Sequence, residues 1–172
     1  GKSFPNDVRH DYDGNPCSHR KAHNVYGMQM ARATYHGLKK FSYPKRPFVI
    51  TRAAYSGTQR YTSTWTGDNV ATWDHLAIAN QQAQRMCMSG FSFAGSDIGG
   101  FAEQPSGELF ARWIQLGVFH PFCRVHSSGD HGDQEPWVFG KTVTDIVRKF
   151  IEIRYTLLPY LYTTFWRYTD EG

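Results

Sequence analysis

The sequence predicts an α/β fold made of consecutive β/α units, as in part of a (β/α)8 TIM barrel. Segments with helical and strand patterns alternate from residue 24 to residue 168 in the order helix, strand, helix, strand, helix, strand, helix. Such alternation is typical of a parallel sheet covered by helices. Three strands cannot close a barrel that usually takes about 250 residues, which leaves a small open sheet or a slice of a barrel. Polar clusters directly after each predicted strand favour the slice, because their side chains would converge on one rim.

The first part of the chain predicts a loop and then a helix. Residues 1–20 are rich in Asp, Asn, Gly, Pro and His, which indicates irregular structure. Residues 24–39 carry apolar side chains at roughly helical spacing, and Pro44 and Pro47 end this pattern.

Three short apolar runs predict strands. Residues 48–51 are apolar and β-branched at successive positions, as in a strand buried on both faces of a parallel sheet. Arg52 follows this strand, where it would either pair with a structural acid or serve a site at the end of a barrel strand. Residues 91–95 and 118–122 are the other two strand candidates.

Three further segments predict helices. Residues 73–89 carry apolar side chains at helical spacing, and Gly90 is a typical helix stop. Residues 108–116 resemble another helix. Residues 142–168 carry one broad apolar stripe that we expect to pack in a core, and Pro159 should kink this helix.

Composition and charge set limits on the class of protein. The chain has 172 residues, 40% hydrophobic, 20% charged and 16% aromatic, as expected for one globular domain with a sizeable core. The net charge of +4 comes from scattered basic residues, so neither nucleic acid nor an anionic membrane is an expected partner. No apolar run reaches transmembrane length, and no signal-peptide segment opens the chain. The composition leaves the compartment unknown.

Cysteine and histidine patterns predict neither a disulfide framework nor a metal site. The cysteine count of three is odd and includes no C-x-x-C pair, so we expect buried free thiols. His19 and His23 have the spacing of zinc proteases, but Arg20 stands where the motif requires Glu, so local hydrogen bonds are expected instead. A charged loop that we expect to be solvated contains Asp130, His131, Asp133 and Glu135.

The loop Trp65-Thr66-Gly67-Asp68-Asn69 is the central candidate for chemistry. A carboxyl group beside an indole ring would lose water on one side, which raises the pKa of an acid and suits it to donate a proton near neutral pH. The first hypothesis is therefore that Asp68 is a general acid. The alternative is purely structural, because the same residues make a good turn and a helix N-cap.

The chain also carries a series of polar and aromatic segments in a characteristic order. They are His23-Asn24-Val25-Tyr26-Gly27, Arg46-Pro47-Phe48-Val49-Ile50-Thr51-Arg52, Gln59-Arg60-Tyr61, Trp65-Thr66-Gly67-Asp68-Asn69, Gly95-Ser96-Asp97-Ile98-Gly99-Gly100-Phe101, Pro121-Phe122-Cys123-Arg124-Val125-His126, Glu135-Pro136-Trp137 and Arg154-Tyr155-Thr156-Leu157-Leu158-Pro159-Tyr160. Each segment alone is a weak signal. Together they cover nearly the whole chain and resemble glycoside hydrolase family 31.

This resemblance implies a (β/α)8 barrel and retaining hydrolysis of α-glycosides. Asp68 matches the family's general acid/base, which would protonate the leaving oxygen and then deprotonate the attacking water. The family's hydroxyl-binding and apolar positions match the rest of the expected site. The residues expected to bind hydroxyls of the terminal sugar are Arg52, Asp97 and His126, and those expected to form the apolar wall are Trp65 and Phe101.

One departure from the family pattern matters for mechanism. Retention requires a second carboxylate about 5 Å from the first, and the Trp-x-Asp-Met-Asn-Glu-type motif that supplies it in the family is absent here. We therefore expect residues 1–172 to be a partial catalytic barrel that lacks the early strands and the last strand. The nucleophile would lie upstream of Gly1, and the segment alone would be inactive.

The resemblance favours removal of terminal α-linked glucose from an α-glucoside oligosaccharide. The alternatives are an α-xylosidase or an α-glucan lyase of the same family, or a carbohydrate-binding module without catalysis. No metal or organic cofactor is implied, since two carboxylates suffice. The expected partners are the substrate and the rest of the chain's own barrel, and open sheet edges invite pairing with another chain.

Overall fold

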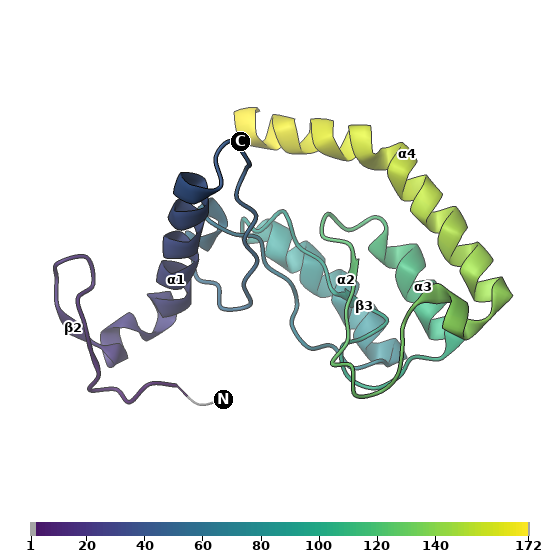
Figure 1. Ribbon diagram of the computed structural model, residues 1–172, viewed down its shortest axis with the longest axis horizontal. Helices are drawn as coiled ribbons and strands as arrows, with labels where there is room; N and C mark the ends of the chain where they lie inside the picture. The colour runs from purple at the N-terminus through teal and green to yellow at the C-terminus, as the bar shows by residue number, and fades with distance from the viewer. Residues whose placement is uncertain (1–2, 172) are drawn as a thin grey trace. The chain divides into compact units, whose positions relative to one another are not determined.

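The computed structural model describes residues 3–171, which divide into two compact units with the boundary between Thr64 and Trp65. The first unit contains β1 (Arg9–His10), β2 (Cys17–Ser18), α1 (His19–Phe41) and the 3-10 helix η1 (Thr58–Arg60) (Figure 1). The second unit contains α2 (Trp73–Met88), β3 (Asp97–Ile98), α3 (Gly107–Gly117), β4 (Arg124–Val125), the 3-10 helix η2 (Pro136–Phe139) and α4 (Lys141–Glu171).

The first unit is built around α1. The predicted helix over residues 24–39 is confirmed, and it begins earlier, at His19, where the backbone N–H donates to the carbonyl of Val8 at 2.7 Å. Residues 1–20 are mainly irregular, as expected, but they include the short antiparallel pair β1–β2. Ordering this segment against α1 requires contacts between residues far apart in sequence, which composition does not reveal.

The strand predicted over residues 48–51 is wrong as a buried strand. The backbone there makes one isolated parallel bridge, between Ile50 and Ser63. The Ser63 N–H donates to the Val49 carbonyl at 2.9 Å, and the Thr51 N–H donates to the Ser63 carbonyl at 3.1 Å. Phe48 is 60% exposed. The segment is extended, but among the described residues its lateral hydrogen bonds join it to Ser63 and build no ladder.

The core of the second unit lies around α3. Phe110, Trp113 and Val118 are fully buried, and Ile98 of β3 and Val147 of α4 pack in the same cluster. The predicted helix over residues 108–116 is confirmed as α3, which begins after Ser106, whose hydroxyl caps the Leu109 N–H. Leu109, Phe110, Trp113 and Ile114 of α3 are buried, because the helix packs against α4, β3 and α2, and the Phe110 ring stacks on Phe139 of η2.

Strands β3 and β4 lie beyond the segments predicted for them. The expected strands over residues 91–95 and 118–122 are wrong, and the parallel pair is formed by Asp97 with Arg124 and Ile98 with Val125. Residues 118–122 form a turn after α3 instead. The Arg154 guanidinium holds this turn, because it donates to the carbonyls of Val118 and His120 at 2.7 and 2.8 Å. Thus β3, α3 and β4 form a βαβ unit, the element expected of a parallel α/β fold.

The two remaining helices are confirmed at their predicted places. Helix α2 ends before Gly90, which has a φ of +85°. Helix α4 contains Pro159 and bends along its length, as expected for a helix with an internal proline (Figure 1). Its stripe is only partly core, because Val147 alone is buried among its described residues and Tyr155 and Tyr160 are exposed.

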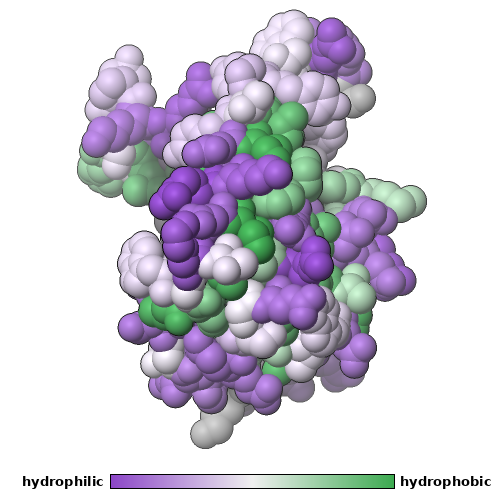
Figure 2. Space-filling model, turned by 90° about the vertical axis from the view of Figure 1, so that its right-hand side faces the viewer, coloured by the Kyte–Doolittle hydropathy of each residue, from purple (hydrophilic) through white to green (hydrophobic). Residues whose placement is uncertain are grey.

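The described surface mixes apolar and polar side chains. Figure 2 shows hydrophobic residues in green among hydrophilic ones in purple on the face that it displays. No helix among the described residues is both long and apolar enough to cross a bilayer.

Candidate active site

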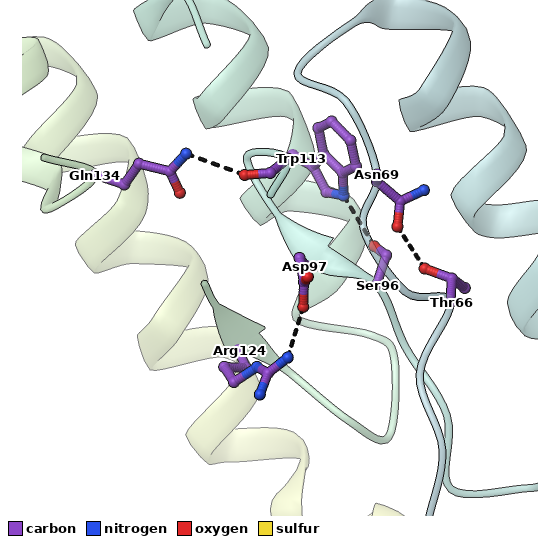
Figure 3. A network of polar contacts seen from close by, with 8 residues as sticks. Thr66, Asn69, Ser96, Asp97, Trp113, Arg124 and Gln134 are labelled. Atoms are coloured by element: carbon purple, nitrogen blue, oxygen red, sulfur yellow. Dashed lines mark hydrogen bonds and ion pairs between the residues drawn. The ribbon is translucent and has the colours of Figure 1, made fainter. Parts of the chain in front are cut away.

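The candidate site begins with a buried ion pair between β3 and β4. Because Asp97 and Arg124 are register partners in a parallel pair, their side chains leave the same face of the strands. The Arg124 guanidinium donates through Nη2 to Asp97 Oδ1 at 2.7 Å (Figure 3). The Asp97 side chain is fully buried, whereas 31% of the Arg124 side chain is exposed. Asp97 therefore lies at the bottom of the cluster, and Arg124 extends from it toward the surface.

Aromatic rings flank this ion pair. The Arg124 guanidinium carbon lies 5.5 Å from the centre of the Trp65 ring and 5.0 Å from that of Phe122. Both distances are within the range of a cation–π interaction. Trp65, one of the expected wall residues, is half-buried. Arginine, carboxylate and indole thus form one continuous cluster in the second unit.

Opposing effects set the protonation of Asp97. Burial raises the pKa of the Asp97 carboxyl above its ordinary value of 3.8, and the negative charge of Asp68 acts in the same direction. The hydrogen bond and positive charge of Arg124 lower this pKa, and His126 adds a smaller effect of the same sign. The ionised form of Asp97 therefore depends on its cationic neighbours.

Several buried polar atoms of this cluster have no hydrogen-bond partner among the described residues. They are Asp97 Oδ2, Arg124 Nε and Trp65 Nε1. Buried polar atoms are nearly always paired in folded proteins, so a group of unpaired ones calls for an explanation. A ligand rich in hydroxyl groups supplies both donors and acceptors of the kind these atoms need.

Phe101 and His126 form a second contact in the same unit. Their ring centres are 5.3 Å apart, and the planes are tilted by 37°. The Phe101 backbone holds both neighbouring loops, because its N–H donates to the Asn69 carbonyl at 2.7 Å and its carbonyl accepts from the Ser128 N–H at 2.9 Å. Two residues predicted for one site from distant motifs are therefore brought together.

The loop that carries Asp68 is fixed by its neighbours. The Thr66 N–H donates to the Gly95 carbonyl at 3.1 Å, and the Thr66 hydroxyl donates to Asn69 Oδ1 at 2.5 Å (Figure 3). Asn69 is buried, but Asp68 is exposed. The expectation that an indole removes water from this carboxyl is not met in the described chain. Of the structural alternative, the turn is confirmed, because the Asn69 N–H donates to the Gly67 carbonyl at 3.0 Å, but the helix cap is wrong, because Thr72 caps α2 through its hydroxyl.

Glycines allow the backbone of β3 to lie close to adjacent segments. Gly100 has a φ of +90°, and a Cβ atom there would lie 2.6 Å from the backbone nitrogen of Ala71. Only a glycine fits at this position without a shift of the backbone. Gln134 donates through Nε2 to the Gly100 carbonyl at 3.1 Å, and Ser96 accepts from Trp113 Nε1 at 2.9 Å (Figure 3). These contacts hold Asp97 from both sides of its segment.

The predicted sugar-binding arginine belongs to the other unit. Arg52 is exposed within the first unit, after the extended segment that carries it. The five remaining predicted residues all lie in the second unit, where Arg124 contacts both Trp65 and Asp97, the charge of His126 acts on Asp97, and the His126 ring contacts Phe101.

An open hollow of about 490 Å³ borders His126. The charged loop that follows β4 lines it, which agrees with the expectation that this loop is solvated. The lining residues are Val125, His126, Ser127, Gly129, Gly132, Asp133, Gln134, Glu135 and Pro136.

The metal and cysteine predictions can be compared with the structure. His19 is hydrogen-bonded through its two ring nitrogens to His10 at 2.9 Å and Ser3 at 3.0 Å, as local bonding predicted. Residues 3–171 contain no group of three or more His, Cys, Asp or Glu side chains arranged to hold a metal ion. The cysteines are free, but only Cys17 is buried, whereas Cys123 is partly exposed and Cys87, in the last turn of α2, is exposed.

Sequence reasoning missed two arginines. Arg124 and Arg154 stand inside motifs of the sequence, but residue type and spacing predicted no role for either. Arg154 donates to the carbonyls of Val118, His120 and Pro121, so it fixes the turn that leads into β4. Their presence within motifs that carry site residues is the signal by which the sequence could have indicated them.

Comparison with known proteins gives the same family by three routes. The model of the glycosyl hydrolases family 31 TIM-barrel domain matches residues 1–164. Alpha-glucosidase 2 of Bacillus thermoamyloliquefaciens is 48% identical over 165 residues, 96% of this chain and 21% of that protein. Glucosidase 2 subunit alpha of Saccharomyces cerevisiae is 45% identical over 170 residues, 98% of this chain and 18% of that protein.

Solved structures agree. The glucosidase II alpha subunit bound to Glc1Man2 is 41% identical, with a TM-score of 0.88 over 95% of this chain and 18% of that chain. The family 31 alpha-glucosidase of Bacteroides thetaiotaomicron is 44% identical, with a TM-score of 0.81 over 87% of this chain and 25% of that one. The chain thus spans about a fifth of the length of the curated relatives described above. The predicted fold class is confirmed, and the chain belongs to glycosyl hydrolase family 31, as a part of its TIM-barrel domain.

Proposed function

We propose that the complete protein carrying this chain is a retaining glycoside hydrolase that removes terminal α-linked glucose from α-glucosides. The observation that carries this proposal is the buried Asp97 carboxylate, which uses one oxygen for Arg124 and leaves the other without a partner among the described residues. Trp65 lies against Arg124, and it has an apolar ring face and an N–H that no described residue pairs. Such pairing of polar and aromatic groups suits a pyranose, which has hydroxyls at its edge and apolar faces.

The roles follow from the chemistry of each side chain. Asp68 is the general acid/base: it protonates the leaving oxygen as the bond from the anomeric carbon breaks, and it then takes a proton from the water that attacks the covalent intermediate. Its exposed position gives that water a route to the carboxylate. Arg52, Asp97 and His126 bind sugar hydroxyls, and Trp65 and Phe101 form the apolar wall.

The second carboxylate belongs to a different part of the complete protein. Retention by double displacement requires it about 5 Å from the first, and residues 1–172 contain no Trp-x-Asp-Met-Asn-Glu motif. In this proposal residues 1–172 are a partial catalytic barrel without the early strands and the last strand, and the segment alone does not turn over substrate.

Relatives support glucose as the sugar. The proteins compared above carry α-glucosidase or glucosidase II names, which favours an α-glucosidase over an α-xylosidase, an α-glucan lyase or a non-catalytic module. Release of glucose from maltose and from p-nitrophenyl α-D-glucoside by the complete protein, followed by NMR, tests the reaction. Retention requires α-glucose to appear first, and initial release of β-glucose would exclude this mechanism.

The assignment of Asp68 is tested by Asp68→Asn in the complete protein. We expect hydrolysis of maltose to fall by about 10²- to 10⁴-fold, because its poor leaving group needs a proton donor. The first step with p-nitrophenyl α-D-glucoside should be largely spared, since that leaving group departs without protonation. Asp74→Asn, at an exposed carboxylate in the first turn of α2, is the matched control and should keep full activity. Unchanged hydrolysis of maltose by Asp68→Asn would contradict the assignment.

A further inference from the structure

We propose that Arg124 is a positioning residue, which fixes the Asp97 carboxylate and the Trp65 ring in the arrangement that binds the terminal glucosyl unit. This inference rests on the proposed function. In it, Arg124 does not contact the sugar and acts on sugar binding through Asp97 and Trp65.

The strand pairing places Arg124 opposite its acid. Asp97 and Arg124 are partners in the parallel pair β3–β4, so one register sets the distance between their side chains. The single bond from Nη2 to Oδ1, at 2.7 Å, occupies one carboxylate oxygen. Oδ2 remains an acceptor that no described residue uses. Because the hydrogen bond to Oδ1 fixes the orientation of the carboxylate, Oδ2 also has a fixed orientation. A fixed acceptor oxygen is what binding of a sugar hydroxyl requires.

The guanidinium is itself restrained. It lies over the rings of Trp65 and Phe122 at 5.5 and 5.0 Å. Phe122 is nearly buried, and its N–H donates to the Ala94 carbonyl at 3.2 Å, so its ring has a fixed place. A planar, always-charged group can stack on rings and bind a carboxylate at the same time, which a lysine ammonium cannot do as well. Arg124 therefore links the hydroxyl-binding acid to the apolar wall.

The charge of Arg124 also affects the protonation of Asp97. The groups that act on Asp97 are Arg124 on β4, His126 just after β4 and Asp68 in the loop before α2. Burial and Asp68 favour the protonated acid, whereas Arg124 has the strongest opposing effect and His126 adds to it. Without Arg124, the pKa of Asp97 would rise further, and more of the carboxyl would be protonated at a given pH. A protonated carboxyl loses acceptor capacity for sugar hydroxyls.

The test compares Arg124→Met with Arg124→Lys in the complete protein. Initial rates with p-nitrophenyl α-D-glucoside are measured across the pH range, and kcat and KM are separated at each pH. For Arg124→Met we expect the acidic limb of kcat/KM to move to higher pH by about one to three pH units, the usual effect of an adjacent opposite charge. For Arg124→Lys we expect the limb to stay near its original place, because the charge remains, while KM rises about 3- to 10-fold through loss of ring stacking.

Two controls separate this role from general destabilisation. Arg112→Met removes an exposed arginine that pairs with Glu108 on α3. It should leave KM and the acidic limb of the kcat/KM pH profile unchanged. Asp97→Asn removes the titrating group, so adding Arg124→Met to it should not move the limb any further. A shift that persists in the Asp97→Asn background would overturn the inference.

The other outcomes with the Arg124 variants also test the inference. A folded Arg124→Met variant with an unmoved limb and unchanged KM overturns the inference. If Arg124→Met does not fold, Arg124→Lys decides through KM, and an unchanged KM overturns it. Failure of the proposed function has a different signature, because the unmodified protein would then release no glucose, or Asp97→Asn would leave kcat/KM intact. In that case both proposals fail together.

Discussion

His19 in the first unit and Asp97 in the second are both almost completely buried, but their hydrogen-bonding differs. Both ring nitrogens of His19 have partners within the unit, in His10 and Ser3. Among residues 3–171, Asp97 has one hydrogen-bond partner for its two carboxylate oxygens. A buried polar group whose bonds are all made inside the fold holds that fold together. One that keeps unused capacity beside aromatic rings is suited to bind a molecule from outside.

Within this comparison, the largest expected effect comes from replacing each of the two residues in turn. Asp97→Asn in the complete protein should lower kcat/KM for p-nitrophenyl α-D-glucoside by about 10- to 100-fold, the usual weight of a hydrogen bond to a charged group. His19→Asn should leave kcat/KM per folded molecule close to its original value while lowering Tm. Steady-state kinetics and scanning calorimetry on the same samples check both. The contrast fails if His19→Asn reduces kcat/KM as strongly as Asp97→Asn.

The next effect sharpens the comparison one residue away from Asp97. Ser96 and Trp113 satisfy each other in the buried core, as His19 and its partners do. Ser96→Ala should lower the free energy of unfolding by about 1–3 kcal/mol, because it leaves the indole N–H unpaired. In a double-mutant cycle with Trp113→Phe, the interaction energy should be about 0.5–3 kcal/mol. Urea unfolding of the four proteins measures it, and strict additivity would show that this bond contributes nothing.

The smallest effect is a difference of sign in the pH dependence of stability. Burial raises the pKa of Asp97 above 3.8, so the folded state holds its proton longer than the unfolded state, and this residue's contribution to stability falls as pH rises from 3.8 to the raised pKa. Burial lowers the pKa of His19 below 6.5, and the charges of His10 and His23 add to this effect. The contribution of His19 therefore falls as pH drops below 6.5 toward the lowered pKa.

Urea unfolding of the unmodified protein, Asp97→Asn and His19→Asn at a series of pH values tests these signs. The stability difference between the unmodified protein and Asp97→Asn should shrink as pH rises above 3.8. The corresponding difference for His19→Asn should shrink as pH drops below 6.5. Slopes of the same sign for both variants would contradict the assigned directions.

Helices were the most predictable part of the fold. α1, α2, α3 and α4 all cover their predicted segments, with small changes at the ends. A helix is closed by hydrogen bonds between residues four apart, so its pattern and its caps are local. Strands were predicted less well. The runs at 91–95 and 118–122 are apolar, but pairing occurs at Asp97 and Arg124, because a strand is defined by a partner that lies far away in sequence.

The candidate site was predictable as a set of residues but not as a set of roles. The motifs named Trp65, Asp68 and Asp97, and the structure places all three in the second unit. The expectation of a buried acid was attached to Asp68, which is exposed, whereas the buried acid is Asp97. An adjacent tryptophan in sequence does not decide burial, because a side chain is covered by whatever segments pack over it.

By itself, the sequence determined the family, the helices and the identity of the candidate side chains, since these depend on residue type, local spacing and motif order. Only the tertiary structure decided that Arg124 faces Asp97, that Phe101 contacts His126, and which buried polar atoms have no hydrogen-bond partner in the described part of the chain. The physical reason is distance along the chain. Each of those contacts joins residues 25 or more positions apart, and its geometry follows from strand register and packing rather than from the residues that stand beside it in sequence.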